Sequence, residues 1–192
     1  MGASGVGCYP GSFNPPTVAH LAIAQAALLQ GELERIDWVV SRVALGKEQV
    51  QIPTLDDRVS VLEAVARTRP WLGVRVTDDR LVADIANGCD VLIVGADKWA
   101  QMLDASWYDS DAARDAALAR LPRVLVAPRR GVQVPLGDAE ALILDDDHGH
   151  VSSTAVREGR LDLMLPEAAE FDAATGAWTD PERYRAARDV RE

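Results

Sequence analysis

The chain has 192 residues, 48% of them hydrophobic and 26% charged, as is usual for one globular domain with a substantial core. The net charge of −10 argues against a surface that attracts nucleic acid, although a few local donors would be enough to bind a small phosphate ester. No stretch approaches the roughly 20 apolar residues of a membrane span, and the N-terminus lacks the basic and apolar regions of a signal peptide. Two isolated cysteines suit neither a disulfide framework nor a zinc site. We therefore expect a cytoplasmic protein that binds neither nucleic acid nor membrane.

Apolar runs alternate with helix-like segments along the chain, which is typical of a parallel α/β sheet. The expected elements are, in chain order, a strand at Val6–Tyr9, a helix at Val18–Leu29, a strand at Ile36–Val43, a helix from Thr54 to Val65, a strand at Leu72–Val76, a helix at Arg80–Ala86, a strand at Asp90–Val94, a helix within Asp109–Ala119, strands at Arg123–Ala127 and Ala141–Leu144, a helix from Thr154 onward and a short polar helix at Pro181–Arg191. The segments Arg42–Pro53 and Val132–Glu140 are expected to be surface loops. The pattern predicts a Rossmann-like, doubly wound parallel sheet at residues 1–170 and a small helical C-terminal tail at residues 171–192.

The stretch GSFNPPTVAH, from Gly11 to His20, lies between the first strand and the first helix, where open α/β sheets place their ligands. Gly11 would let the backbone approach a ligand closely. The two prolines hold the chain extended until Thr17 can cap the helix. His20 lies three residues further, on the same side, so that a hydroxyl and an imidazole face backbone N–H groups that favour an anion. The stretch predicts a phosphate site.

A second stretch, VSSTAVR at Val151–Arg157, follows the last predicted strand and opens a helix. Its hydroxyls can cap that helix and bind phosphate, and Ser153 shares a helix face with Arg157, whose guanidinium fork suits phosphate oxygens. Alone, such a string is an ordinary helix start. Paired with the stretch near the other end of the chain it becomes more specific, and it predicts a second phosphate site.

Between these stretches, Gly95 and Asp97 close the most apolar strand, where a carboxylate can accept hydrogen bonds from a ribose or cap a helix. His148 and His150 lie in a predicted exposed loop, and no distant ligand is indicated. A solvated turn is therefore favoured there over a metal site.

The two stretches resemble the signatures of the HIGH-type nucleotidyltransferases, in particular the nicotinate/nicotinamide mononucleotide adenylyltransferases, over roughly residues 6 to 170. Ala19 departs from the Gly of many members, and the family's Pro-Pro-His before the lysine is absent at Lys47. Arg58 falls near a family arginine, with a solvated charge as the alternative. The segment from Tyr9 to Phe13 also resembles phosphopantetheine adenylyltransferase.

The resemblance implies transfer of AMP from ATP to nicotinate or nicotinamide mononucleotide, with release of pyrophosphate, in NAD biosynthesis. It implies Thr17, His20 and Arg157 as catalytic residues, with His20 a cation when ATP is bound, and Mg²⁺ bound mainly through the ATP phosphates. The other implied ATP contacts are Gly11, Ser12, Phe13, Ala19, Gly95, Asp97, Val151, Ser152, Ser153 and Thr154. The implied acceptor contacts are Lys47, Arg129 and Trp107, whose ring would stack on the pyridine.

Alternatives stay open. One is the same chemistry on phosphopantetheine, or cytidylyl transfer; another is a nucleotide-binding regulator with impaired catalysis. An NAD-dependent oxidoreductase is disfavoured because no Gly-x-Gly-x-x-Gly follows the first strand. The choice between nicotinate and nicotinamide, and between a monomer and a homo-oligomer, is not decided by the sequence.

Overall fold

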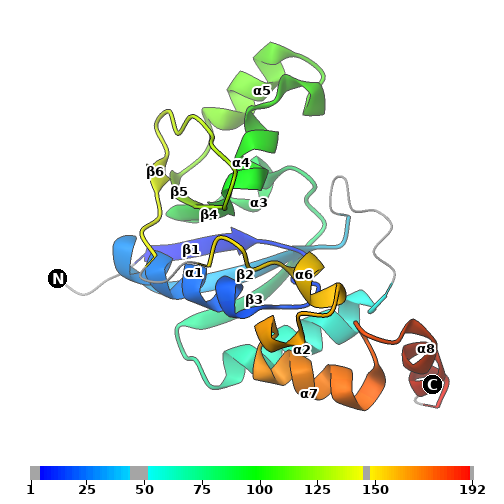
Figure 1. Ribbon diagram of the computed structural model, residues 1–192. Coiled ribbons are helices and arrows are strands. Elements are labelled where there is room, and N and C mark those ends of the chain that lie inside the picture. The colour runs from blue at the N-terminus through cyan, green and yellow to red at the C-terminus, as the bar shows by residue number, and fades with distance from the viewer. Residues whose placement is uncertain (1–4, 44–51, 145–147, 191–192) are drawn as a thin grey trace.

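A parallel sheet of six strands forms the centre of the molecule, whose computed structural model describes residues 5–43, 52–144 and 148–190 (Figure 1). The strands are β1 (Gly5–Pro10), β2 (Leu33–Ser41), β3 (Leu72–Thr77), β4 (Val91–Gly95), β5 (Arg123–Ala127) and β6 (Glu140–Ala141). All neighbours pair in parallel, in the order β3-β2-β1-β4-β5-β6. This order confirms the predicted doubly wound sheet. It reverses direction between β1 and β4, and ligand crevices form at the carboxyl ends of strands at such a point.

Helices cover both faces of the sheet. They are α1 (Val18–Gln30), α2 (Leu55–Arg67), α3 (Val82–Ile85), α4 (Ala96–Leu103), α5 (Asp111–Leu118), α6 (Ser153–Arg157), α7 (Pro166–Thr175) and α8 (Pro181–Asp189), with short 3₁₀ turns at Ala105–Trp107 and Leu161–Leu163. α1 and α2 pack against one face and α3 and α4 against the other; in Figure 1, α4 and α5 lie toward the top of the molecule and α2 and α7 toward the bottom. No helix in the described part of the chain combines the length and apolar character that a membrane span requires.

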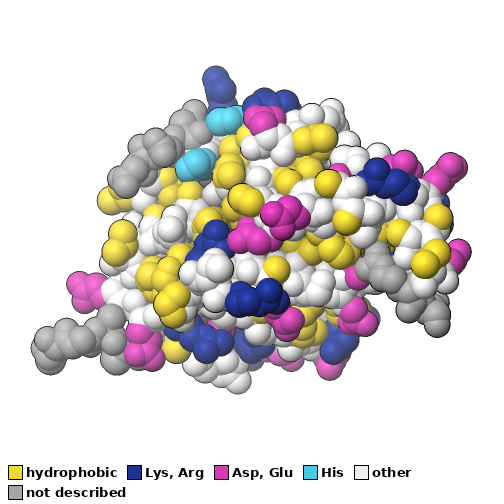
Figure 2. Space-filling model, turned by 90° about the horizontal axis from the view of Figure 1, so that it is seen from below, with side chains coloured by type: hydrophobic (Ala, Val, Ile, Leu, Met, Phe, Trp, Pro, Cys, Tyr) yellow, Lys and Arg dark blue, Asp and Glu magenta, His cyan; other side chains and the backbone are white. Residues whose placement is uncertain are grey.

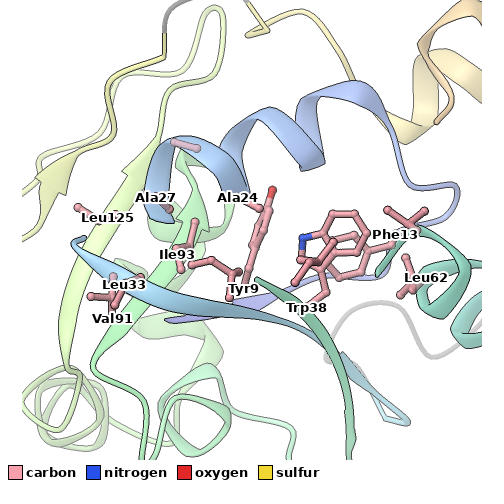
Figure 3. Packing of buried hydrophobic residues seen from close by; sticks show 14 of the residues in the cluster. Tyr9, Phe13, Ala24, Ala27, Leu33, Trp38, Leu62, Val91, Ile93 and Leu125 are labelled. Carbon is pink, nitrogen blue, oxygen red and sulfur yellow. The ribbon is translucent and has the colours of Figure 1, made fainter. Parts of the chain in front are cut away.

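Each central strand contributes to two cores because successive side chains point to opposite faces. In β4, Val91 and Ile93 pack into the cluster under α1 and α2, and Leu92 and Val94 pack into the cluster under α3 and α4. This explains why the strand is apolar throughout. Figure 3 shows the first cluster, in which the ring of Phe13 lies against Trp38 with centroids 4.9 Å apart.

Several elements differ from their predicted bounds. Helix α4 was not expected, because the chain passes from strand to helix at Gly95 with no intervening loop. The helix expected from Thr154 onward divides into α6 and α7, because Gly159 turns the chain with a φ of 112° and Pro166 starts a new helix. The strand expected at Ala141–Leu144 pairs over just two residues, at Glu140–Ala141, and the helix expected at Arg80–Ala86 covers four.

The C-terminal segment packs onto the sheet domain. The expected boundary at residue 170 falls inside α7, and beyond it Trp178 and Tyr184 are buried in a shared cluster with α6. The hydroxyl of Tyr184 accepts from the backbone N–H of Thr54 at 2.9 Å and donates to Asp57 Oδ2 at 2.5 Å. These bonds tie α8 to the start of α2.

Candidate active site

A pocket of about 780 Å³ lies at the carboxyl ends of β1, β4 and β5, at the point where the strand order reverses. We call it the larger pocket. The expected site residues that line it are Gly11, Ser12, Thr17, Ala19, His20, Gly95, Asp97, Arg129, Val151, Ser152, Ser153, Thr154 and Arg157. The structure therefore brings the two stretches, from opposite ends of the chain, to one cavity.

Direct hydrogen bonds join the two stretches. The hydroxyl of Ser153 donates to the backbone oxygen of Pro15 at 2.7 Å, although the two residues are 138 positions apart. The guanidinium of Arg157 donates to the backbone oxygen of Asn14 and, at 3.2 Å, to Thr154 Oγ1. The start of α6 is thus bound to the loop that precedes α1.

The ring of His20 is oriented by the cap of α1. Its Nδ1 accepts the backbone N–H of Thr17 at 3.0 Å and lies 2.8 Å from the Thr17 hydroxyl. A backbone N–H can only donate, so Nδ1 carries no proton while this bond exists, and the proton of the neutral ring is on Nε2. Nε2 is therefore the ring nitrogen that can donate while this bond exists. The positive charge that the resemblance implies for His20 when ATP is bound stays a prediction.

Buried groups from outside the pocket hold the loop between β1 and α1. The side chain of Arg58 is buried, and its Nη1 donates to the backbone oxygen of Ser12 at 2.9 Å. Burial lowers the pKa of Arg58. From the C-terminal segment, Trp178 Nε1 donates to Asn14 Oδ1 at 2.6 Å, and both residues are buried. Arg58 is therefore a support for this loop rather than a solvated charge.

Phe13 is placed differently from the expectation that it contacts ATP. Its side chain is 1% exposed and packs in the core against Trp38 and behind His20, whose ring centroid lies 5.0 Å away, so the Phe13 ring does not line the pocket. This packing also explains Gly11, because a Cβ there would lie 2.9 Å from the Phe13 ring. By contrast, a Cβ at Gly95 would meet no protein atom within 4 Å, so the space beside Gly95 is open to a ligand.

The larger pocket gathers positive charge. Among the residues that the structure describes, Lys98, Arg129 and Arg157 line it together with one carboxylate, that of Asp97. Arg129 Nε lies 3.5 Å from Asp97 Oδ2, and Arg129 Nη1 donates to the backbone oxygen of Val151 at 3.4 Å. Elsewhere the charges are mixed, as on the face in Figure 2, where acidic and basic side chains are interspersed. A chain with a net charge of −10 therefore still has a local site for an anion.

A smaller pocket of about 110 Å³ adjoins the larger one. Apolar side chains of β2, α3 and α4 line it, as do Trp107 and Tyr108. Trp107 is 44% exposed, which leaves its ring accessible, and the Tyr108 hydroxyl donates to the backbone oxygen of Met102 at 3.1 Å. Of the expected acceptor contacts, Trp107 lies here, Arg129 lies in the larger pocket, and Lys47 lies outside the described residues.

The sequence profile of the cytidylyltransferase-like family matches residues 8–159, which include both stretches and both pockets. The chain belongs to this family. A Coprothermobacter proteolyticus protein named as a probable nicotinate-nucleotide adenylyltransferase is 24% identical over 167 residues, or 81% of this chain and 82% of that protein. A phosphopantetheine adenylyltransferase of Lachnoclostridium phytofermentans is 36% identical over 92 residues, or 47% of this chain and 53% of that protein. Among solved structures, the chain is similar to that of Plasmodium falciparum nicotinic acid mononucleotide adenylyltransferase complexed with NaAD. The TM-score is 0.63 at 12% identity, and the match covers 88% of this chain and 94% of that one, which shows that the two proteins share a fold.

The larger pocket of this cytidylyltransferase-like protein also contains residues that were not expected in the site. Lys98 and His148 line the larger pocket, and so does Tyr9, whose pKa burial raises. A signal for Lys98 exists, since it directly follows Asp97 at the end of the strongest strand. His148 was placed in a solvated turn, and no local pattern separates it from His150, which is exposed.

Proposed function

We propose that this protein transfers AMP from ATP to nicotinate or nicotinamide mononucleotide and releases pyrophosphate, a step of NAD biosynthesis. The observation that carries the proposal is the meeting of the two stretches, residues 11–20 and 152–157, in one cation-lined pocket beside a second pocket with an exposed aromatic ring. The named relatives support the same chemistry.

In this proposal the larger pocket binds ATP. The N-terminus of α1, thirteen residues long, directs backbone N–H groups and its dipole at the triphosphate. His20 Nε2–H donates to an oxygen near the scissile bond, and its orientation is fixed by Thr17. The guanidinium of Arg157 and the hydroxyls at the start of α6 bind the outer phosphates. Asp97 is placed to accept hydrogen bonds from the ribose.

The reaction requires positioning more than new covalent chemistry. A phosphate oxygen of the acceptor attacks the α-phosphorus of ATP, and the bond from that phosphorus to the oxygen of the leaving pyrophosphate breaks. The acceptor phosphate is already a nucleophile, so no residue has to form a covalent intermediate. The protein must hold two anions in line and stabilise the charge on the leaving group.

The pocket fits a Mg²⁺ ion that arrives with ATP. Across residues 5–43, 52–144 and 148–190, no three His, Cys, Asp or Glu side chains come together as a metal cage. Mg²⁺ commonly keeps several waters and binds chiefly through substrate phosphates with one or two carboxylates, and Asp97 is a half-exposed carboxylate in the pocket. When bound, the ion would neutralise the phosphates.

The smaller pocket would take the acceptor, with Trp107 stacked on the pyridine ring. Phosphopantetheine is the second candidate acceptor, favoured by the match to the Lachnoclostridium phytofermentans enzyme. The cytoplasmic location and homo-oligomer formation stay predictions.

A pyrophosphate-release assay with ATP and Mg²⁺ tests the proposal. Nicotinate mononucleotide, nicotinamide mononucleotide, phosphopantetheine and a no-acceptor control are compared at equal concentrations. We expect one of the two pyridine mononucleotides to give the highest kcat/KM, with the dinucleotide found by mass spectrometry. A higher kcat/KM for phosphopantetheine than for either mononucleotide would identify phosphopantetheine as the acceptor. ATP binding without release of pyrophosphate for any acceptor would indicate a regulator.

A further inference from the structure

The two pockets share a boundary at the end of β1 and the start of α4. Four residues, Pro10, Gly11, Ser12 and Lys98, line both pockets, and of these four Lys98 carries a charge. Lys98 thus lies at the boundary between the cavity of the two signature stretches and the cavity of Trp107.

The position of Lys98 follows from the topology of the sheet. β4 pairs with β1, so the first turn of α4 lies beside the segment that leaves β1. Lys98 is half-buried on this turn, and its Nζ donates to Gln101 Oε1 at 2.5 Å, one turn further along the helix. The amide therefore restrains the ammonium at the boundary.

A cation at this boundary would reduce the electrostatic repulsion between the two phosphate groups that react with each other. If ATP occupies the larger pocket and the acceptor the smaller, the acceptor phosphate and the α-phosphate of ATP must meet where the pockets join. Both groups are anions and repel each other. A lysine ammonium is a compact charge with three donors that can contact both groups at once.

We propose that Lys98 is a catalytic residue that binds the acceptor phosphate and the α-phosphate of ATP at the boundary of the two pockets. This inference rests on the proposed adenylyl transfer. In the step, an acceptor oxygen bonds to the α-phosphorus as the bond from that phosphorus to pyrophosphate breaks, and the electron pair leaves with pyrophosphate. Lys98 keeps its protons throughout and reduces the repulsion between the reactants. The ligands that Lys98 would contact are a phosphate monoester, as the acceptor, and a nucleoside triphosphate.

Lys98→Met tests this role because it keeps the length of the side chain and removes the charge. Pyrophosphate release is measured with ATP, Mg²⁺ and the best acceptor of the panel, so that kcat and the two KM values are obtained separately. We expect kcat to fall about 10²-fold, as when one donor to a reacting phosphate or oxyanion is lost. Lys98→Arg, which keeps the charge, should retain most of the kcat. Arg120→Met removes the same charge from a half-exposed residue outside both pockets, paired with Asp84 at 3.0 Å, and should leave kcat unchanged.

The outcomes separate the two proposals. An active wild-type protein with unchanged kcat and acceptor KM in Lys98→Met would overturn the role of Lys98 and leave the adenylyl transfer intact. A wild-type protein that releases no pyrophosphate with any acceptor would overturn both. A loss of kcat in Lys98→Met that Lys98→Arg does not rescue, accompanied by a lower melting temperature in both variants, would show a structural role and also overturn the inference.

Discussion

The two sides of the larger pocket are built in different ways. One side, residues 11–20 with residues 152–157, is fixed by buried contacts, among them Arg58 to Ser12 and Trp178 to Asn14. The other side, which includes Asp97 and Arg129, presents partly exposed charges, and these two side chains are 61% and 37% exposed. Fixed donors suit the point where a bond breaks, whereas exposed charges can adjust to a substrate. We therefore expect changes on the fixed side to reduce catalysis, ATP binding or stability strongly, and changes at the Asp97–Arg129 pair to affect ATP binding only weakly.

The largest effect is expected on the fixed side from His20→Ala. Loss of the Nε2 donor should reduce kcat by about 10²–10³-fold while the fold persists. Saturating rates of pyrophosphate release and circular dichroism measure the two properties. His150→Ala, at an exposed histidine, is the control and should behave as the wild-type protein. A normal kcat in His20→Ala would show that His20 is not a catalytic residue.

Arg157→Ala tests the other segment of the fixed side. A charged hydrogen-bonding group contributes about 1.5–3 kcal/mol, so the KM for ATP should rise at least about tenfold, with less change in the KM for the acceptor. Arg160→Ala is a matched control, because Arg160 is exposed and pairs with Asp162 at 2.9 Å. Unchanged ATP affinity in Arg157→Ala would count against an ATP contact at α6.

Trp178→Phe removes a support of the fixed side at a residue that does not itself line the larger pocket. The buried Oδ1 of Asn14 would lose its donor, and an unsatisfied buried group costs about 1–3 kcal/mol of unfolding free energy. Urea unfolding measures this loss. Trp107→Phe, at a half-exposed tryptophan, should change the stability by less than about 0.5 kcal/mol. Equal stabilities of the two variants would show that the C-terminal segment does not support the loop.

The smallest effect is expected from Asp97→Asn on the exposed side. Exposed ion pairs contribute about 0–1 kcal/mol, so the stability should barely change, and the KM for ATP should rise a few-fold because the amide still accepts a hydrogen bond. Asp111→Asn, at a carboxylate that is 78% exposed and lies 3.6 Å from Arg114, is the control for stability and rate. A loss of kcat as large as that of His20→Ala would end the distinction between the two sides.

The features that the sequence predicted are local ones. Alternating apolar runs define β1 to β5, and Thr17 with His20 is readable as a helix cap, because the cap and the histidine lie in one turn. The strongest strand ends at Gly95, so the switch-point crevice could be anticipated. The meeting of the two stretches followed from the family resemblance, and the Ser153 to Pro15 hydrogen bond is its structural counterpart.

The features that could not be predicted depend on contacts between distant residues. The burial of Phe13 is set by Trp38, and the need for Gly11 is set by the Phe13 ring. The hydrogen bond of Trp178 to Asn14 joins residues 164 positions apart, so the C-terminal tail gave no local sign of its role. Lys98 acquires its position from the pairing of β4 with β1, which spacing along the chain does not reveal.

A crystal structure of the protein with Mg²⁺ and a non-hydrolysable ATP analogue would show whether both stretches bind one triphosphate. We expect triphosphate oxygens within about 3 Å of both His20 Nε2 and a donor of residues 152–157, with the nucleotide in the larger pocket. A nucleotide bound elsewhere, or a triphosphate in contact with one stretch while the other faces water, would rule out a shared phosphate site.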